Sequence, residues 1–464
     1  MRISTRQFQQ TAKETIEDPR LQAAYQSGMH RLSTSRDEAY AQVPDIEAMR
    51  DELKKIRQAV IANLADYLEE FERNAQIAGA VVHWANDSAE VGRIVLDIAR
   101  KENVRQIVKS KSMVTEEIEL NRLLESAGVE VVETDLGEYI IQLAGERPSH
   151  IIAPAVHQTT QQVADLFSRK LFQEVEASPE ALTEVARKTL RRMFLEAKIG
   201  ISGVNLGVAE TGSIVLVTNE GNGRMVTSLP AVHIAVMGIE RLAPNWESAA
   251  TWLSLLARSA TGQPLSIYTS VVTGPAKSDE LDGPREVHII LLDNQRSTLT
   301  GTRYQEVLEC IRCGACLSVC PVYKEAGGHA YHSPYSGPIG AVISPLLFGL
   351  ENYPGLPQAS TLCGACLDVC PVRIDLPRML LALRVDEVDR GLVAWPEQIT
   401  ERMGARVMSK PGWMNFFFKL GRIGQLWMRL FNLKYNGFEN YPLVAKNSFR
   451  DIWPSLEADD DQQE

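Results

Sequence analysis

The seven cysteines of this 464-residue chain are confined to two short windows, and their spacing constrains the fold more than any other feature of the sequence. Each window ends in a cysteine followed by proline. The cysteines are Cys310, Cys313, Cys316 and Cys320 in the first window and Cys363, Cys366 and Cys370 in the second. The first window has the spacing of bacterial ferredoxins, in which three thiolates bind one cluster and the fourth binds another. We therefore expect the two segments to fold together around two iron-sulfur clusters.

The crossed ferredoxin pattern assigns ligands to both clusters. Cluster one is predicted to use Cys310, Cys313, Cys316 and Cys370, and cluster two to use Cys320, Cys363 and Cys366. Cluster two is one thiolate short. Ser360 stands where a complete second window would have its first cysteine, so it is a weak fourth ligand beside an open iron site, or it only caps a turn. We expect a stable [4Fe-4S] cluster one and a labile cluster two that loses an iron in air to become [3Fe-4S].

Two other uses of cysteine compete with this interpretation. Zinc also binds C-x2-C pairs, but it needs only four ligands, whereas this chain offers seven in ferredoxin spacing. Structural disulfides are rare in reducing compartments, and residues 1–10 lack the apolar segment of a secretory signal. Thiolate-bound clusters pass single electrons, so the pattern predicts electron transfer without identifying a substrate.

Charge and hydropathy exclude other classes of protein. The net charge of -11 disfavours binding to nucleic acid, whose polyanionic backbone selects basic surfaces. The most apolar run, residues 341–350, is far shorter than the ~18 residues that span a bilayer. We expect a cytoplasmic protein, either soluble or peripheral to the membrane. A tail at 414–433 resembles a basic amphipathic helix, but its clustered aromatic residues favour packing against protein rather than lipid, and the acidic end at 459–464 is expected to be disordered.

The chain is expected to have four parts. These are a helical segment at 1–75, an α/β domain at 76–296, a [4Fe-4S] ferredoxin-type domain at 297–395, and an arm with an acidic tail at 396–464. Within the second part, short apolar runs alternate with helical patterns, which predicts a parallel sheet. Strands are expected at 79–84, 105–108, 129–133, 150–156, 213–218, 232–237, 265–273 and 287–292, and helices at 88–100, 115–127, 161–172 and 181–197.

Polar segments interrupt the apolar pattern of the α/β domain. Loops that follow parallel strands bind ligands in such folds, so Lys109, Lys111 and Arg224 are candidates to hold an anion. Glu210 is a candidate general base, or else a residue that caps its loop. Residues 219–223 have the composition of a turn. The remaining candidates are histidines that are either ligands or structural residues, namely His150, His157 and His233.

Several motifs together resemble the lactate utilization protein B family. They are Glu133 to Glu138, Glu210 to Ser213, Asn219 to Asn222, Leu229-Pro230 with His233, and then the cysteine windows. The resemblance spans nearly the whole chain. It implies a lactate-utilization (LUD) domain, similar to the sugar-phosphate isomerase and CoA-transferase type of α/β fold, followed by a mainly helical, two-cluster ferredoxin-like domain.

The resemblance also implies a role. The chain would supply the electron path in the oxidation of L-lactate to pyruvate, together with a cysteine-rich redox subunit, a second LUD protein and an electron acceptor. Two alternatives stay open: a self-contained enzyme that acts on a small hydroxy acid or acyl substrate, and a redox subunit of another hydroxy-acid oxidase. A cluster that serves only as a redox sensor or structural brace is a further alternative. We expect no NAD or FAD site, because no glycine-rich dinucleotide fingerprint follows a strand.

Overall fold

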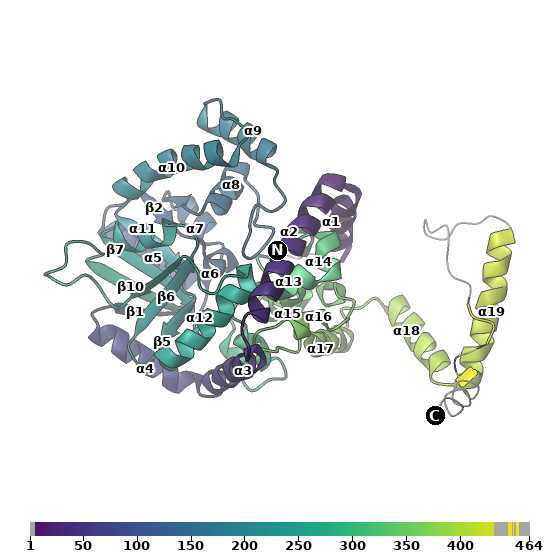
Figure 1. Cartoon of the computed structure of the whole chain (residues 1–464). Coiled ribbons are helices and arrows are strands. Elements are labelled where there is room, and N and C mark those ends of the chain that lie inside the picture. The colour runs from purple at the N-terminus through teal and green to yellow at the C-terminus, as the bar shows by residue number, and fades with distance from the viewer. Residues whose placement is uncertain (1–4, 431–443, 448, 450–451, 454–464) are drawn as a thin grey trace. The chain divides into compact units, whose positions relative to one another are not determined.

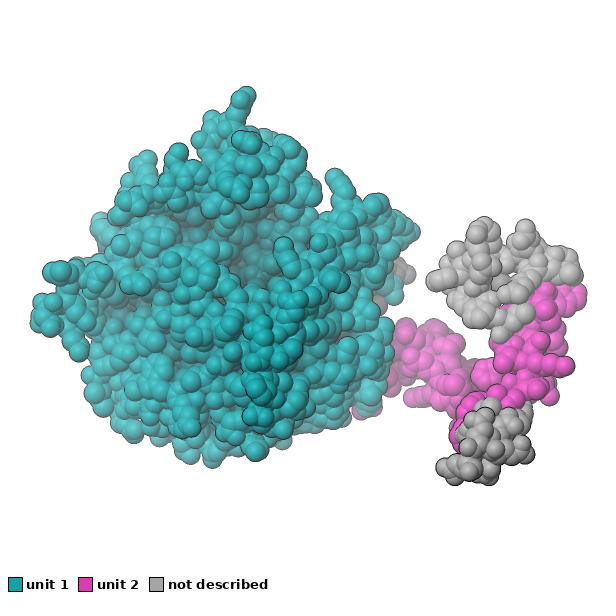
Figure 2. All heavy atoms as spheres, viewed as in Figure 1, with its two compact units in different colours: residues 1–386 teal, residues 387–464 magenta. Residues whose placement is uncertain are grey.

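The computed structural model describes residues 5–430, 444–447, 449 and 452–453 (Figure 1). The chain divides into two compact units, residues 1–386 and 387–464, which are described separately (Figure 2). The α/β domain and the cysteine windows both lie in the first unit. The expected acidic tail at 459–464 lies outside the described residues.

The α/β domain is built on a six-stranded parallel sheet with the strand order β1-β10-β7-β4-β2-β3. The strands are β1 (Val81–Ala85), β2 (Gln106–Lys109), β3 (Glu130–Glu133), β4 (Ile199–Gly203), β7 (Val232–Gly238) and β10 (Glu286–Leu292). Strand β7 is buried along its whole length, as expected for a central strand that is covered on both faces. The parallel sheet predicted from the alternating pattern is confirmed.

A second, four-stranded sheet has the order β8-β5-β6-β9 and mixed strand directions. Its strands are β5 (Leu206–Val208), β6 (Ser213–Thr218), β8 (Leu242–Ala243) and β9 (Tyr268–Val272). The strands expected at 213–218 and 265–273 belong to this sheet and not to the parallel one. The loop at Glu210 is therefore a hairpin turn between antiparallel strands β5 and β6.

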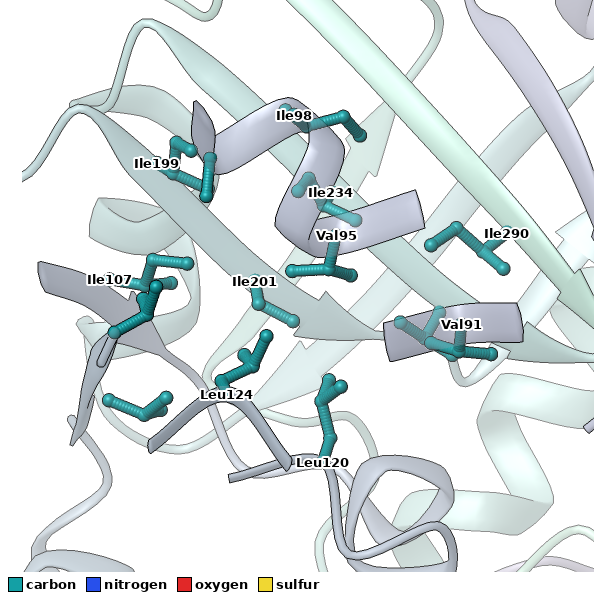
Figure 3. Packing of buried hydrophobic residues seen from close by; sticks show 14 of the residues in the cluster. Val91, Val95, Ile98, Ile107, Leu120, Leu124, Ile199, Ile201, Ile234 and Ile290 are labelled. Carbon is teal, nitrogen blue, oxygen red and sulfur yellow. The ribbon is translucent and has the colours of Figure 1, made fainter. Parts of the chain in front are cut away.

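Helices cover the parallel sheet because their apolar faces repeat at helical spacing. They are α5 (Ser88–Lys101), α6 (Met113–Glu117), α7 (Leu120–Ser126), α8 (Leu136–Ala144), α9 (Thr160–Leu171), α10 (Pro179–Glu196), α11 (Asn222–Ser228) and α12 (Trp246–Thr261). On one face, Val95 of α5 and Leu124 of α7 pack with Ile201 and Ile234 of the sheet (Figure 3). Helix α5 begins where Asp87 accepts a hydrogen bond from the amide of Glu90, and it ends in basic residues that suit the helix dipole.

Two predicted elements are wrong. The segment 150–156 forms turns and not a strand, because Nδ1 of His150 accepts hydrogen bonds from the amides of Ile152 and Ala153, which a strand would use for pairing, and Pro154 has no amide hydrogen. The single helix expected at 115–127 is broken into α6 and α7 at Glu119, whose φ is +50°. A side-chain acceptor and a left-handed residue thus override the local apolar pattern.

The N-terminal segment is helical, as expected, but it contacts more than the α/β domain. It contains α1 (Thr5–Glu17), α2 (Pro19–Ala41), α3 (Ile46–Ala62) and α4 (Leu64–Ile77). Phe8 of α1 contacts Tyr331 edge to face with ring centroids 5.5 Å apart, and Tyr25 of α2 contacts Tyr323 at 5.9 Å. Phe71 of α4 packs with Met237 beneath the sheet. These helices therefore join the cysteine region to the α/β domain.

The cysteine region of the first unit is mainly helical. Its helices are η1 (Ser297–Leu299), η2 (Gln305–Glu309), α13 (Ala315–Val319), α14 (Pro321–Ala326), η3 (His329–Tyr331), α15 (Gly337–Phe348), η4 (Leu350–Asn352), η5 (Leu356–Gln358), α16 (Ala365–Asp368) and α17 (Leu376–Asp389), of which residues 387–389 belong to the second unit. Helix α15 is buried along most of its length and lies between the two cysteine windows in the sequence. The order of an α/β domain followed by a helical cysteine domain is confirmed.

The second unit contains α18 (Trp395–Met408) and α19 (Pro411–Leu430). Large apolar side chains of α19 are solvent-exposed, among them Trp413 at 57% and Phe416 at 59%. Of the tail at 414–433, residues 431–433 lie outside the described part of the chain. No helix within the described residues is long and apolar enough to cross a bilayer.

Candidate iron-sulfur centre and neighbouring cavity

The first cysteine window is a loop in which backbone amides point at sulfur. Arg312 and Gly314 have left-handed φ angles of 61° and 77°, so the chain curls between one cysteine and the next. The amide of Arg312 donates to Sγ of Cys310 at 3.4 Å. Cys320 caps the N-terminus of α14, where its Sγ accepts from the amide of Tyr323 at 3.5 Å. Such amides stabilise negative charge on thiolate sulfur.

The second window repeats the backbone of the first. Leu362 and Gly364 have φ angles of 55° and 85°, matching the pair of left-handed residues in the first loop. The hydroxyl of Ser360 accepts a hydrogen bond from the amide of Leu362 at 3.1 Å. Ser360 therefore occupies the place that Cys310 has in the first loop.

The thiols form two adjoining groups. Burial raises the pKa of Cys313, with further increases from nearby Cys370 and Cys310. Burial also raises the pKa of Cys366 to about 12, and there the contributing neighbours are Cys320 and Cys363. The first group therefore contains Cys310, Cys313 and Cys370, and the second contains Cys320, Cys363 and Cys366.

The two groups of thiols lie next to each other. Burial raises the pKa of Cys316, and its neighbours include both Cys310 of one group and Cys366 of the other. Cys363 is exposed, and a hydrogen bond from the backbone of Ala365 lowers its pKa. One edge of the second group is thus open to solvent.

The residues present fit iron-sulfur clusters. Buried thiols crowded together disfavour their own ionisation, whereas iron binds thiolates and reverses this preference. Soft sulfur donors, amides directed at sulfur and glycines at left-handed φ are the features that such clusters need. Cluster one would be held by Cys310, Cys313, Cys316 and Cys370, and cluster two by Cys320, Cys363 and Cys366.

Helix α3 places three cationic side chains against the cysteine loops. Arg50 donates from Nη2 to the carbonyl oxygen of Cys370 at 2.9 Å. Lys54 donates to the carbonyl of Arg373 at 3.0 Å, and Arg57 donates to that of Glu309 at 3.2 Å. Positions 50, 54 and 57 share one face of a helix, so their charges face the same loops. These contacts were not predicted, although the spacing of the three cations is visible in the sequence.

A cavity of about 280 Å³ lies at the carboxyl ends of the parallel strands. Ser110, Asn205 and Glu240, which follow β2, β4 and β7, contribute to its wall. Arg312 and Tyr335 of the cysteine region line it as well. Ligands bind at this edge of open α/β sheets, and here the edge adjoins the loop that carries Cys310 and Cys313.

Arg312 has one guanidinium nitrogen that is free to bind a ligand. Its Nη2 lies 3.6 Å from Oε1 of Glu240, and its guanidinium carbon lies 4.5 Å from the ring centroid of Tyr335. Its Nη1 is buried and has no hydrogen-bond partner among the described residues. A buried donor without a partner costs free energy, so this nitrogen favours an acceptor in the cavity.

A second arginine beside Glu240, Arg296, is fully paired. Nε of Arg296 lies 2.7 Å from Oε2 of Glu240, and its Nη2 lies 2.7 Å from Oε2 of Glu117. The hydroxyl of Tyr335 donates to the same Glu117 oxygen at 2.6 Å. Burial opposes ionisation of Glu240, but the neighbouring arginines outweigh it and lower the pKa. This network fixes the ring on which Arg312 rests.

The cavity wall also holds an exposed carboxyl whose pKa is raised, that of Glu220. Partial burial raises the pKa of Glu220 to about 8, with a further increase from Asp135, which also lines the cavity. Lys111 lines the same wall and donates to the carbonyl of Ile152 at 2.8 Å. The cavity therefore offers cationic donors and one group that can give or accept a proton near pH 8.

Comparisons with known proteins give the family. Residues 68–292 match the LUD domain, and residues 306–374 match the 4Fe-4S dicluster domain. The chain is 44% identical to lactate utilization protein B of Bacillus pumilus, over 97% of this chain and 98% of that protein. The chain belongs to the lactate utilization protein B family. It is also 46% identical to the Bacillus subtilis protein of that name, over 84% and 82% of the two chains.

The name of a further relative refers to electron transport. The chain is 42% identical to the uncharacterized electron transport protein YkgF of Escherichia coli, over 89% of this chain and 87% of that one. The match to the dicluster domain shows that this member of the lactate utilization protein B family carries an iron-sulfur domain.

Of the cations expected to hold an anion in this family member, Lys111 alone lines the cavity. Lys109 is fully buried and pairs with Glu133 at 2.7 Å and Glu116 at 3.2 Å. Arg224 is exposed and is not part of the cavity wall. The prediction of a three-cation site is therefore wrong. Lys109 is held in ion pairs within the α/β domain, and Arg224 lies outside the cavity wall.

Other candidate residues also have structural partners. Oε1 of Glu210 accepts from the amide of Trp246 at 2.7 Å, outside the cavity, which agrees with a loop-capping role. His150 accepts from two amides, as described above. Nε2 of His233 lies 2.8 Å from the hydroxyl of Ser202. His157 belongs to a separate polar group of this chain, together with Glu146 and His329. Of the turn expected at 219–223, residues 219–221 lead into α11, whereas residues 222 and 223 are the first residues of that helix.

Proposed function

We propose that this chain is the electron-transfer subunit of a complex that oxidises L-lactate to pyruvate. The observation that carries the proposal is the arrangement of all seven thiols in two adjoining groups, with Cys316 and Cys366 between them. The names of the relatives, which refer to lactate utilization and to electron transport, support the same role.

In this proposal the ligand sets follow the crossed pattern. Cysteines 310, 313, 316 and 370 hold cluster one, and cysteines 320, 363 and 366 hold cluster two with Ser360 as the weak fourth ligand. When bound, such clusters pass single electrons. The protein's own contribution is to direct amides at sulfur and to place Arg50 and Arg57 against the loops of cluster one. Nearby positive charge favours the reduced, more anionic state.

The proposed partners are a cysteine-rich redox subunit, a second LUD protein and an electron acceptor. Cys363 is exposed, whereas Cys313 is buried, so the side of cluster two is the one that a partner can approach. We infer that electrons enter or leave the chain there. The cavity is lined by Arg312, which lies between Cys310 and Cys313 in the loop of cluster one.

The test uses the full chain, reconstituted anaerobically with iron and sulfide. L-lactate is added to the chain alone, to its two companions alone, and to all three together, and bleaching of the cluster absorbance is followed. We expect bleaching only in the complete mixture. Bleaching by lactate with the isolated chain would replace the subunit role with that of a self-contained enzyme. No bleaching in any mixture would contradict a role in lactate oxidation.

A second candidate function is favoured by one observation, the free Nη1 of Arg312 in the cavity. A guanidinium nitrogen is a strong donor to a carboxylate, and the cavity is close in size to small-ligand pockets of about 300 Å³ and more. In this alternative the α/β domain itself binds a small hydroxy acid, or an acyl substrate, beside cluster one. Titration calorimetry with L-lactate, other 2-hydroxy acids and acetate separates the cases, since a redox subunit without its own substrate site releases no heat with any of them.

A further inference from the structure

A second group of polar residues lies away from the cysteines and the cavity. It contains Glu146, which follows α8, His157, which precedes α9, and His329, the first residue of η3. One potential ligand atom from each of the three side chains lies within 4.8 Å of the others. The two imidazole rings meet edge to face with centroids 4.6 Å apart. Nothing in the electron path uses this group.

The hydrogen bond of His329 fixes where its proton lies. Nε2 of His329 is 2.8 Å from the carbonyl oxygen of Arg147. A carbonyl oxygen only accepts, so Nε2 must carry the hydrogen. In the neutral ring the lone pair is then on Nδ1, and this imidazole can act as a ligand.

The contacts of His157 direct one ring nitrogen at a carboxylate. Nδ1 of His157 lies 2.9 Å from the hydroxyl of Ser149, which also lies 3.0 Å from the carbonyl oxygen of Pro154. Nε2 of His157 lies 2.7 Å from Oε2 of Glu146, and without a metal these two atoms are joined by a hydrogen bond. A metal ion that displaces the shared proton would bind the same nitrogen and oxygen.

We propose that Glu146, His157 and His329 bind a divalent transition-metal ion, with zinc as the best match. Two neutral imidazoles and one carboxylate form the His2Glu donor set that zinc accepts, with a fourth position for water. In tetrahedral zinc sites, ligand atoms lie about 3.4 Å apart, so the observed separations require only adjustment of Glu146 and His329, which are not buried.

The surrounding hydrogen bonds are those that orient metal ligands. The carbonyl of Arg147 and the hydroxyl of Ser149 each hold the outer nitrogen of one imidazole. The side-chain amide of Gln158 donates to both oxygens of Glu146, at 3.2 and 3.1 Å. Partners of this kind set the tautomer of the histidine and the direction of the carboxylate.

The metal would join two parts of the first unit. Glu146 and His157 belong to the α/β domain, whereas His329 lies just beyond α14, the helix that Cys320 caps. The two segments already touch, since a Cβ on Gly328 would lie 1.7 Å from the carbonyl oxygen of Ser149. We infer a structural zinc ion that fastens the cysteine region to the α/β domain.

The test uses the anaerobically reconstituted protein, so that the cysteines are occupied by their clusters. Zinc is added, excess is removed by dialysis, and the bound metal is measured by mass spectrometry and zinc X-ray absorption. We expect one zinc ion per chain with nitrogen and oxygen ligands only. Glu146→Gln and His329→Ala should each weaken zinc binding by more than about tenfold, whereas the exposed His30→Ala should leave it unchanged.

A third variant tests the role of the Ser149 hydroxyl in orienting His157. Ser149→Ala keeps all three ligands and removes only the hydroxyl that holds Nδ1 of His157, so zinc affinity should fall by about 10- to 100-fold. Iron content and melting temperature equal to the wild type, with all proteins measured free of zinc, show that the variants are folded. The proposal is overturned by zinc-sulfur scattering near 2.3 Å, by equal zinc retention in His329→Ala or Ser149→Ala, or by no retained zinc in the wild type.

Discussion

Ser360 and Cys310 occupy equivalent positions in two loops with the same backbone conformation. Each side chain accepts a hydrogen bond from the amide two residues later, at 3.1 Å to the Ser360 hydroxyl and 3.4 Å to the Cys310 sulfur. The residue that donates has a left-handed φ in both loops. The second loop therefore presents an oxygen where the first presents a thiol.

This equivalence makes the fourth ligand of cluster two the first target for mutation. A serine hydroxyl is a far weaker ligand for iron than a thiolate. We expect the wild type to lose one iron from cluster two in air and to show a [3Fe-4S] signal by electron paramagnetic resonance. Ser360→Cys should keep its iron and show little of that signal. Iron and sulfide counts before and after exposure give the same comparison.

The matched control is Cys310→Ser, which exchanges the same two side chains in the first loop. It should make cluster one as labile as cluster two is in the wild type. If both clusters of the wild type survive air equally well, and the added thiol changes nothing, then cluster two has another strong ligand and the assignment of Ser360 is wrong.

Arg57 is predicted to be essential for stability. Its guanidinium is fully buried and donates to four carbonyl oxygens, those of Glu240, Leu242, Leu308 and Glu309. Arg57→Met leaves these acceptors without a partner and should lower the free energy of unfolding by about 3–5 kcal/mol. An anaerobic thermal melt should show a drop of about 6–10 °C. Arg187→Met, at an exposed arginine, should leave the melting temperature within about 1 °C, and an equal drop there would contradict the argument.

Arg312 is predicted to determine whether the cavity binds a carboxylate. Arg312→Gln removes the partnerless Nη1 and shortens the side chain. If a small 2-hydroxy acid binds in the cavity, its dissociation constant should rise at least about tenfold, the loss expected for a charge-assisted hydrogen bond. Titration calorimetry measures this, with the exposed Arg192→Gln as control. Unchanged binding in Arg312→Gln would place the ligand elsewhere.

Glu138 is predicted to make stability depend on pH. Burial, opposed by Lys111, raises its pKa from 4.5 to about 8. Because the folded pKa lies above the unfolded one, the folded state binds more protons between these values, and stability falls as pH rises from about 4.5 to about 8. Glu138→Gln should remove roughly 2 kcal/mol of this loss between pH 6 and 9. Melting curves across this range check it against the exposed Glu176→Gln, whose pH dependence should match the wild type.

The exposed face of α19 is predicted to bind protein and not lipid. Its aromatic residues follow one another, as in Phe416, Phe417 and Phe418, and do not form a single stripe. In a flotation assay with anionic liposomes at physiological salt, most of the purified chain should stay with the unbound fraction. Recovery of most of it with the liposomes would contradict this prediction.

Much of the fold follows from local patterns. The alternation of apolar runs and helices predicts the parallel sheet, because buried strands and amphipathic helices have different periods. The exceptions have local physical causes. His150 folds back on two amides of its own segment, and Glu119 adopts a left-handed conformation inside a helical pattern. Neither event changes the apolar pattern that the prediction uses.

The cysteine loops could be predicted and their surroundings could not. Spacing predicts that the cysteines of each window share one loop, since the ferredoxin pattern is a local property of the chain. The contact of Arg50 with Cys370 joins residues 320 positions apart, and no periodicity reports such a contact. Lys109 and Lys111 have similar surroundings in the sequence, yet Lys109 pairs with Glu133 whereas Lys111 lines the cavity. This difference depends on tertiary contacts, which the sequence pattern does not report.

The contacts of α1 and α2 with the cysteine region have a consequence for biosynthesis. These two helices end at residue 41, whereas their partner α14 begins at residue 321, which is 280 positions later. At roughly 5–20 residues per second, the ribosome needs about 15–60 s to make that stretch. During this time Phe8 and Tyr25 of the first helices cannot pack, because their partners Tyr331 and Tyr323 have not yet been synthesised. Iron loading of the complete thiol set thus becomes a late event in the life of the nascent chain, after most of the polypeptide has already been made.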